Sequence, residues 1–182
     1  CREILGRLSA LGEGEEVEPF GRLPVSGLAE AAAAPHRNDT VTLEVIATPS
    51  EGSDATEPSA PRRAEILHGL GNVIENAVQF CTNRVEVVVT WDDQLITMEV
   101  MDDGPGVAPS VLMRLGEPYV SSRRKSGRMG LGVFIAKTLL ERTGASMSFF
   151  NGRQYGARIV ITWPRQVLEA LSADQRDVKL HG

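Results

Sequence analysis

The sequence predicts an α+β domain, a two-layer sandwich in which helices cover a mainly antiparallel mixed sheet. Apolar and polar residues alternate over 84–101 and over 145–163, each time around a short turn, which predicts two β-hairpins. Apolar residues recur at helical spacing over 62–80 and 131–142, which predicts two longer helices. Helices that stand beside hairpins, rather than alternating strictly with single strands, favour one helical layer on an antiparallel sheet.

The first 61 residues predict short elements joined by flexible connections. Residues 13–24 are acidic and interrupted by Gly and Pro, so we expect a linker, and residues 48–61 have a loop composition. Residues 28–34 are Ala-rich and predict a helix, and the alternation over 41–47 predicts a strand. Residues 1–11 predict the end of a longer helix, because apolar residues stand at helical spacing: Ile4, Leu5, Leu8 and Leu11.

The helix predicted over 62–80 is the longest element, and two strands follow it at 84–91 and 94–101. Between these strands, Asp92-Asp93 suits the tight turn of a hairpin. The apolar side of the helix consists of Ile66, Leu70, Val73, Ala77 and Phe80.

The C-terminal third predicts a helix and a second hairpin. The helix over 131–142 ends near Gly144, a residue suited to a left-handed C-cap. The strands of the hairpin are predicted at 145–150 and 157–163, and a short helix is predicted at 166–171.

Composition narrows the classes of function. The net charge of -5 argues against a nucleic-acid-binding domain, which usually carries a basic face. The two cysteines, Cys1 and Cys81, are too few for a disulfide framework, which favours an intracellular setting. No histidine pair has metal-ligand spacing, so we expect no zinc site. Because the chain begins at Cys1 and has no apolar run of about 20 residues, we expect a fragment without a membrane span of its own.

Two asparagines on the helix predicted over 62–80 are candidate site residues. Asn72 and Asn76 are four residues apart, so they lie one turn apart on one face. An amide buried in a helix needs a polar partner. Two interpretations stay open at this point: both side chains face solvent, or an amide oxygen coordinates a hard cation such as Mg²⁺, which prefers oxygen ligands.

Two glycine motifs add candidate ligand contacts. Asp102-Asp103-Gly104-Pro105-Gly106 directly follows a predicted strand. It supplies a carboxylate that can accept from an adenine amine and glycines that let the backbone approach a ligand, although ordinary turns have the same composition. Met129-Gly130-Leu131-Gly132-Val133 opens a predicted helix, whose free N–H groups suit phosphate oxygens. Each motif alone is weak evidence for a nucleotide site.

In combination, the motifs resemble the ATPase domain of histidine kinases, over about residues 28–164. Asn-x-x-x-Asn-Ala at 72–77, Asp-x-Gly-x-Gly at 102–106 and Gly-Leu-Gly-Val-x-Ile-Ala-Lys at 130–137 are similar to its N, G1 and G2 boxes in order and spacing. Glu117-Pro118-Tyr119 resembles its F box, with Tyr in place of the usual Phe. Further similarity at 1–5, 76–80, 129–136 and 138–145 points to the redox-responsive RegB/PrrB-type sensor kinases.

This resemblance implies the Bergerat fold and a site for ATP and Mg²⁺. Asn76 would ligate Mg²⁺ between the phosphates, Asn72 would support the phosphate end, and both are the implied catalytic residues. Asp102 would bind the adenine amine, and 107–129 would form the ATP lid. The other implied ATP contacts are Phe80, Gly104, Gly106, Tyr119, Arg123, Lys125, Gly130, Leu131 and Gly132.

The sequence departs from the family pattern in three respects. Arg128 replaces the first glycine of the commoner G2 box, and Gln79 replaces a basic residue near the phosphates. No histidine stands in a His-Asp/Glu-x-x-x-Pro setting, so the phosphoacceptor would belong to a dimerisation domain outside this chain. The domains implied are the end of that dimerisation helix and a linker at 1–18, the catalytic ATP-binding domain at 19–165, and a C-terminal tail at 166–182.

The resemblance also implies partners, location and a regulatory thiol. The partners would be the chain's own dimerisation domain, in a homodimeric full-length kinase, and a response regulator, with no nucleic acid and no membrane contact by this fragment. The location would be the cytoplasmic side of an inner-membrane sensor kinase of a bacterium. Cys1, beside Arg2, would be the redox-sensing residue, with an inert terminal thiol as the alternative.

Other members of the superfamily remain as alternatives. Type II topoisomerases and mismatch-repair ATPases usually carry Glu where Asn72 stands, which argues against an ATP-driven clamp. An anti-sigma-type serine kinase and a non-catalytic nucleotide-sensing interaction domain stay open.

Overall fold

The computed structural model describes residues 21–114, 117, 131–152 and 156–172. Cys1, the helix predicted at 1–11 and residues 13–20 of the predicted linker lie outside this range, as does most of the predicted lid. The elements are, in chain order, β1 (Arg22–Pro24), α2 (Val25–Ala33), the 3₁₀ turn η1 (Ala34–His36), β2 (Thr42–Pro49), β3 (Ser59–Pro61), α3 (Ala64–Phe80), β4 (Arg84–Trp91), β5 (Leu95–Asp102), α4 (Pro109–Leu112), α5 (Leu131–Glu141), β6 (Ser146–Asn151), β7 (Ala157–Pro164) and α6 (Arg165–Ala170).

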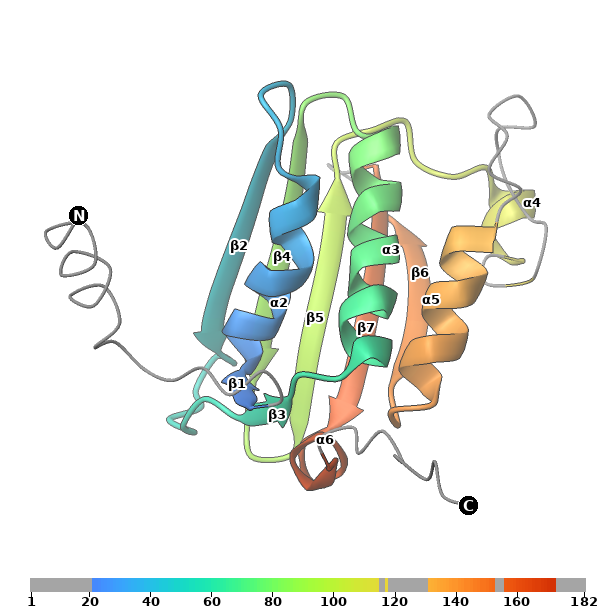
Figure 1. The fold of residues 1–182 in the computed structure, drawn as a ribbon. Helices are drawn as coiled ribbons and strands as arrows, with labels where there is room; N and C mark the ends of the chain where they lie inside the picture. Colours follow the sequence, from blue (N-terminus) through green and yellow to red (C-terminus); the bar gives the residue numbers. More distant parts are fainter. Residues whose placement is uncertain (1–20, 115–116, 118–130, 153–155, 173–182) are drawn as a thin grey trace, which may run out of the picture.

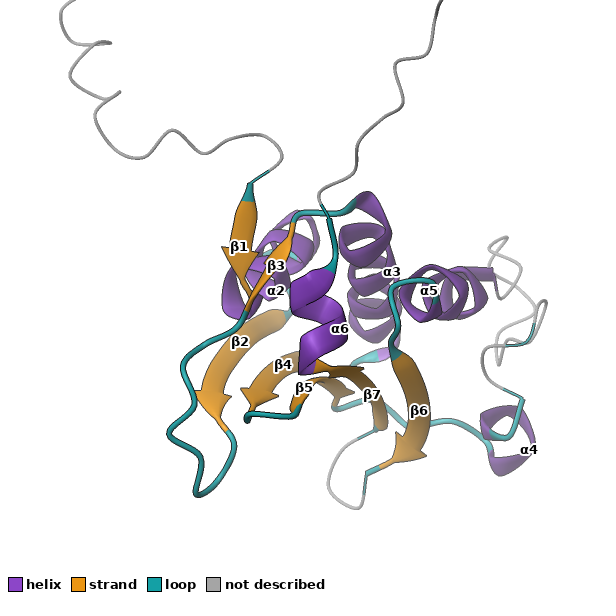
Figure 2. Cartoon of the chain, turned by 90° about the horizontal axis from the view of Figure 1, so that it is seen from below, coloured by secondary structure: helices purple, strands orange, loops and turns teal. Residues whose placement is uncertain are grey.

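A five-stranded sheet forms one layer, in the order β2-β4-β5-β7-β6. Strand β2 runs parallel to β4, and the other neighbours are antiparallel. Helices α2, α3 and α5 cover one face of the sheet (Figures 1 and 2). The predicted α+β sandwich with a mainly antiparallel mixed sheet is therefore confirmed.

Both predicted hairpins form, and their alternation determines which face is buried. Val100 of β5 lies opposite Val87 of β4 and Ile159 of β7, and all three side chains are buried. The turn between β4 and β5 is held by Asp92, whose carboxylate accepts hydrogen bonds from the N–H groups of Gln94 and Leu95 at 2.7 and 2.8 Å. These backbone hydrogen bonds lower the pKa of Asp92.

Helices α3 and α5 pack closely because a glycine stands at their contact. A Cβ on Gly69 would lie 2.6 Å from Cγ of Leu140, so a larger residue would push the helices apart. At the end of α5, Gly144 has φ +89° and its successor Ala145 donates to the Leu140 carbonyl, so the predicted left-handed cap is confirmed. The buried side of α3 follows the predicted helical spacing, with Ile66, Gly69, Leu70, Val73, Ile74 and Ala77.

The predicted linker at 13–24 and the predicted loop at 48–61 are wrong in part. Strand β1 lies inside the predicted linker and pairs antiparallel with β3, which lies inside the predicted loop. Strand β2 also continues to Pro49. The ribbon of β1 and β3 is stabilised by contacts with distant residues, which local composition does not reveal.

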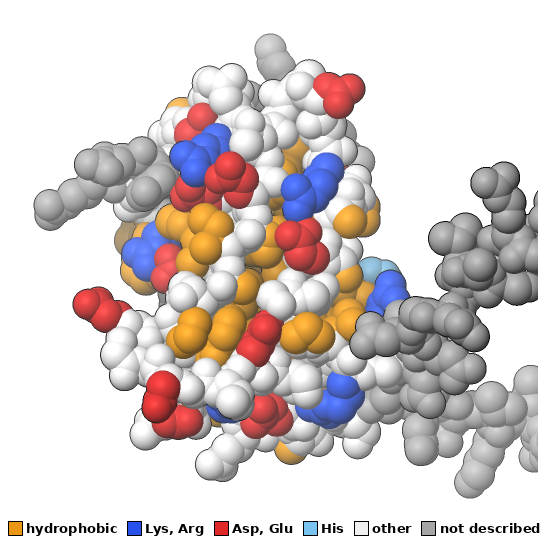
Figure 3. All heavy atoms as spheres, turned by 90° about the vertical axis from the view of Figure 1, so that its left-hand side faces the viewer, with side chains coloured by type: hydrophobic (Ala, Val, Ile, Leu, Met, Phe, Trp, Pro, Cys, Tyr) orange, Lys and Arg blue, Asp and Glu red, His pale blue; other side chains and the backbone are white. Residues whose placement is uncertain are grey.

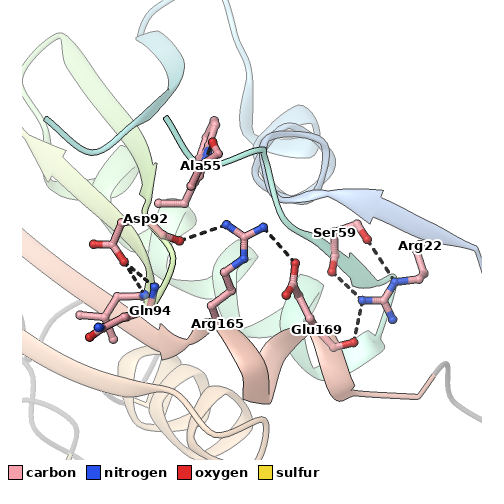
Figure 4. A network of polar contacts seen from close by, with 9 residues as sticks. Arg22, Ala55, Ser59, Asp92, Gln94, Arg165 and Glu169 are labelled. Carbon is pink, nitrogen blue, oxygen red and sulfur yellow. Dashed lines mark hydrogen bonds and ion pairs between the residues drawn. The ribbon is translucent and has the colours of Figure 1, made fainter. Parts of the chain in front are cut away.

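Arg22 ties this ribbon to the C-terminal helix α6, and Arg165 ties that helix to the turn between β4 and β5, as Figure 4 shows. The Arg22 guanidinium donates to the main-chain oxygens of Ser59 at 2.6 Å and Glu169 at 2.9 Å. Arg165 donates to the Asp92 carbonyl at 3.0 Å and pairs with the Glu169 carboxylate at 3.3 Å. The predicted helix at 166–171 therefore forms as α6 and packs on the domain, with Leu168 buried in the core.

The side of the molecule at the left of Figure 1, where β2 is the edge strand, carries acidic and basic side chains around apolar ones (Figure 3). Arg84 pairs with Glu44 and Glu86, and Arg37 pairs with Glu30. Neither sign of charge dominates this face. Within the described ranges, no helix is both long and apolar enough to cross a bilayer.

Candidate functional site

The site is built around Asp102, the last residue of β5. Its side chain is only 5 % exposed, and Oδ1 accepts hydrogen bonds from the N–H groups of Gly104 at 2.8 Å and Ala157 at 3.2 Å. Within the described residues, Oδ2 accepts no hydrogen bond. Burial raises the pKa of Asp102, which the two hydrogen bonds oppose and the nearby Asp103 charge reinforces. Asp102 is thus a fixed, buried carboxylate with one oxygen left to accept a hydrogen bond.

Glycines let the backbone close around this carboxylate. A Cβ on Gly104 would lie 2.2 Å from the Phe80 carbonyl oxygen, so glycine is required where the loop meets the end of α3. Gly106 has φ +74°, a conformation that side chains disfavour. A Cβ on Gly156 would lie 2.3 Å from Oδ1 of Asp102, and its N–H donates to the Asp102 carbonyl at 2.6 Å. Gly156 precedes a predicted strand, but its contact with Asp102 was not predicted from the sequence.

Asp103 holds the same loop from its other side. Its Oδ1 accepts from the N–H groups of Thr82 at 2.8 Å, Asn83 at 3.0 Å and Arg84 at 3.0 Å. Burial raises the pKa of Asp103, but these hydrogen bonds together lower it below its usual value. Asp103 therefore holds the glycine loop against the turn between α3 and β4, a role that was not predicted from the sequence.

Asn151 of β6 secures the point where the chain leaves the glycine loop. Its Oδ1 accepts from the N–H of Val107 at 2.9 Å, and its Nδ2 donates to the Val107 carbonyl at 2.7 Å. A Cβ on Gly106 would come within 3.0 Å of the same Oδ1. Nothing in the local sequence around Asn151 predicts this contact, because it joins residues 44 positions apart.

The predicted asparagines lie on α3, one and two turns before Phe80. Asn72 is half-buried, and its Nδ2 donates to the His68 carbonyl at 2.9 Å. Asn76 is also half-buried, and its amide makes no hydrogen bond within the described residues. Among the described residues neither amide oxygen accepts a hydrogen bond, which is compatible with both interpretations, contact with solvent and coordination of a cation.

The first turn of α5 adds a third part to the site. Leu131 and Gly132 begin this helix, and a Cβ on Gly132 would meet no described atom within 4 Å. The start of α5, the end of α3 and the end of β5 lie at the same end of the molecule (Figure 1). The glycine loop meets the end of α3 where Gly104 lies against the Phe80 carbonyl.

Five of the predicted site residues lie outside the described residues, namely Cys1, Tyr119, Arg123, Lys125 and Gly130.

The described residues fit an adenine nucleotide better than a protein-held metal centre. The free oxygen of Asp102 suits the exocyclic amine of adenine. Among the described residues, no group of three or more His, Cys, Asp or Glu side chains is placed to hold a metal. A Mg²⁺ ion here would take an amide oxygen from Asn76 and complete its shell with phosphates and water, as Mg²⁺ commonly does.

Comparison with known proteins agrees with this geometry. The family described as histidine kinase-, DNA gyrase B-, and HSP90-like ATPase matches residues 62–167. The sensor histidine kinase RegB of Cereibacter sphaeroides is 36% identical over 90% of this chain, which spans 39% of that protein's length.

Two solved structures share the fold. A mycobacterial sensor histidine kinase, MprB, has a TM-score of 0.63 and 19% identity, over 80% of this chain and 97% of that one. Full-length ShkA, solved in complex with AMPPNP, has a TM-score of 0.61 and 22% identity, over 88% of this chain and 34% of that one.

Proposed function

The chain belongs to the histidine kinase-, DNA gyrase B-, and HSP90-like ATPase family, and from this premise we propose that it is the ATP-binding catalytic domain of a sensor histidine kinase. One observation carries the proposal: Asp102 is buried at a strand end, is held by two backbone N–H groups at Oδ1, and accepts no hydrogen bond at Oδ2 from the part of the chain that the structure describes. No fully buried side-chain oxygen or nitrogen among the described residues lacks a hydrogen-bond partner, so Oδ2 keeps accessible surface and a donor on a ligand can reach it. The exocyclic amine of adenine is such a donor.

The adenine end of the site is preorganised by the chain itself. Gly104 and Gly156 leave space beside Asp102, and Asp103 and Asn151 anchor the loop from two sides. Because these contacts exist before the nucleotide arrives, little ordering is needed on binding. Discrimination for adenine would rest on Oδ2 of Asp102, which accepts from an amine and repels a carbonyl oxygen at the same position of the base.

The phosphate end would lie along α3 and the start of α5. Asn76 would give its amide oxygen to Mg²⁺, and Asn72 would support the phosphates from one turn earlier. Gly132 leaves the first turn of α5 open for phosphate oxygens to approach. Bound Mg²⁺ would supply charge neutralisation. Phosphoryl transfer depends mostly on positioning and charge neutralisation, so these residues would act by orienting the γ-phosphoryl group.

The acceptor and the partners of this domain are also proposals, because the chain spans about two fifths of the length of the curated RegB kinase that it matches. We expect the acceptor to be a histidine on a helical dimerisation domain of the same kinase, with a response regulator as the next acceptor. The whole kinase would be a homodimer of the inner membrane, with this domain on its cytoplasmic side.

Phosphotransfer in trans tests this function. This chain would be mixed with a phosphoacceptor domain of its own full-length kinase and with γ-labelled ATP and Mg²⁺. We expect acid-labile label on the acceptor histidine, and no label with Asn76→Ala. Label on serine would favour an anti-sigma-type kinase, and ATP binding without any transfer would favour a nucleotide-sensing domain; either result contradicts the proposal.

Redox control through Cys1 is a separate part of the proposal. A thiolate beside Arg2 is favoured by the neighbouring positive charge and can form an intermolecular disulfide or a sulfenic acid. Oxidation of a full-length kinase should produce a Cys1-linked dimer with lower kinase activity. Unchanged redox sensitivity in Cys1→Ala would contradict this role, while leaving the nucleotide site unaffected.

A further inference from the structure

An open groove of about 280 Å³ lies between α3 and the preceding α2–η1 segment. Its polar lining comes from His36 on η1 and from His68 and Asn72 on α3, and the rest of its wall is mainly apolar. Two imidazoles from separate elements therefore face one space. Within the described residues, neither imidazole takes part in a hydrogen bond or an ion pair.

Glycine at position 71 leaves the groove open beside His36. Gly71 lines the groove, and a Cβ on it would lie 3.5 Å from Nε2 of His36. His68 stands three residues before Gly71, and Cβ positions three residues apart on a helix are about 5–6 Å from each other. The two histidine side chains thus border the same turn of α3, and their rings can turn toward one ion.

Asn72 supplies an oxygen ligand beside the histidines. Its Nδ2 is engaged by the His68 carbonyl at 2.9 Å, which fixes the amide and leaves Oδ1 without a donor among the described residues. The polar residues that line the groove therefore carry two imidazoles and one amide oxygen. This ligand set suits a divalent transition metal of borderline softness far better than Mg²⁺ or Ca²⁺, which prefer shells composed of oxygen.

We propose that the groove between η1 and α3 binds a divalent transition metal such as Zn²⁺ through His36 and His68, with Asn72 Oδ1 and water completing the shell. The spacing of histidines in the sequence gives no sign of this site, because its two imidazoles are 32 positions apart and meet only in the fold. The metal bound here would be a different ion from the Mg²⁺ that would accompany ATP.

Asn72 links the groove to the nucleotide site. A metal held by Asn72 Oδ1 would remove that oxygen from the phosphate end, so Zn²⁺ and Mg-ATP should weaken each other's binding by the same factor. This consequence rests on the proposed function, whereas Zn²⁺ binding by the protein without nucleotide does not. An experiment can therefore contradict the zinc site without contradicting the proposed ATP site, and the reverse.

Calorimetric titration of Zn²⁺ into the protein, with excess Mg²⁺ and no nucleotide, tests the site. We expect a single Zn²⁺ site whose affinity falls about tenfold or more in His36→Ala and in His68→Ala. His181→Ala controls for the loss of an imidazole elsewhere, and Cys1→Ser and Cys81→Ser control for thiolate binding. Zinc binding that the two groove variants leave unchanged would overturn the proposal, as would the absence of binding.

A glycine variant separates metal binding from folding. Gly71→Ala would place a methyl group beside Nε2 of His36, while alanine favours a helix more than glycine does. We expect this variant to keep or raise the midpoint of thermal unfolding and to weaken Zn²⁺ binding. In NMR spectra of the wild-type protein, Zn²⁺ should shift the imidazole signals of His36 and His68 together. Shifts confined to His181, or wild-type affinity in Gly71→Ala, would contradict the assignment.

Discussion

Replacing Asp102 by asparagine separates its two tasks. Oδ1 accepts from the N–H groups of Gly104 and Ala157, and Oδ2 is left for the adenine amine. An asparagine amide oxygen can take the place of Oδ1 and keep both backbone hydrogen bonds. Its NH₂ group would then replace Oδ2 and place a donor against the donor of adenine. Asp102→Asn should therefore keep the loop and lose the base contact.

The size of the loss follows from the kind of hydrogen bond removed. A hydrogen bond to a charged group contributes about 1.5–3 kcal/mol. Since about 1.4 kcal/mol corresponds to a factor of ten, ATP affinity should fall about 10- to 150-fold. Inosine triphosphate carries a carbonyl oxygen in place of the amine, so its affinity should rise relative to that of ATP.

The free energy of unfolding of Asp102→Asn should stay equal or rise, although its ATP affinity falls. The pKa of Asp102 is raised mainly by burial, so the stability associated with its protonated form is present at low pH and is lost as pH rises through the folded-state pKa. At neutral pH the ionised, buried carboxylate therefore lowers the free energy of unfolding. Asp102→Asn removes that charge and should unfold at an equal or higher denaturant concentration than the wild type.

Asp102→Ala is the matched comparison. It removes the acceptor for both backbone N–H groups, and each N–H left unsatisfied costs up to about 1–3 kcal/mol of stability. Calorimetry with both nucleotides and chemical unfolding at pH 7 distinguish the variants. Wild-type ATP affinity in Asp102→Asn would refute the adenine contact, and equal stability of the two variants would refute the role of Oδ1.

Three other substitutions test the hydrogen bonds of the glycine loop, the space beside Asp102 and the contact between α3 and α5. Asp103→Ala should lower stability at neutral pH by about 0.5–2 kcal/mol, as for lost caps. Because the pKa of Asp103 is lowered, this difference from the wild type should shrink as pH falls through the folded-state pKa in unfolding curves measured from pH 7 to pH 3. Gly156→Ala would bring a methyl group against Oδ1 of Asp102 and should weaken ATP binding more than tenfold by calorimetry; unchanged affinity would contradict the close approach. Gly69→Ala should lower the free energy of unfolding by about 1–3 kcal/mol through overpacking against Leu140, and a gain from helix propensity alone would show that the helices separate freely.

The sequence predicted those parts of the fold that depend on local pattern. The alternation of β4, β5 and β7 and the apolar spacing of α3 are visible within each segment, and Gly144 marks the end of α5. The short strands β1 and β3 could not be predicted, because each is stabilised by the other and by Arg22 contacts with Ser59 and Glu169.

The candidate site also contains residues that local motifs predict and residues whose roles depend on distant contacts. Asp102, Gly104 and Asn76 stand in motifs whose chemistry is visible from residue type and spacing. Asn151 and Gly156 act through contacts with residues more than forty positions away, as in the hydrogen bond from Val107 to Asn151. Asp103 belongs to a motif that was recognised, but its role depends on three N–H groups about twenty positions earlier.

The most direct test of the central claim is a calorimetric titration of ATP into this protein, with and without Mg²⁺, beside Asn76→Ala. We predict binding that is stronger with Mg²⁺ than without it, and loss of that Mg²⁺-dependent gain in Asn76→Ala. Absence of ATP binding to the folded protein under both conditions, or a Mg²⁺-dependent gain that Asn76→Ala leaves intact, would contradict the account.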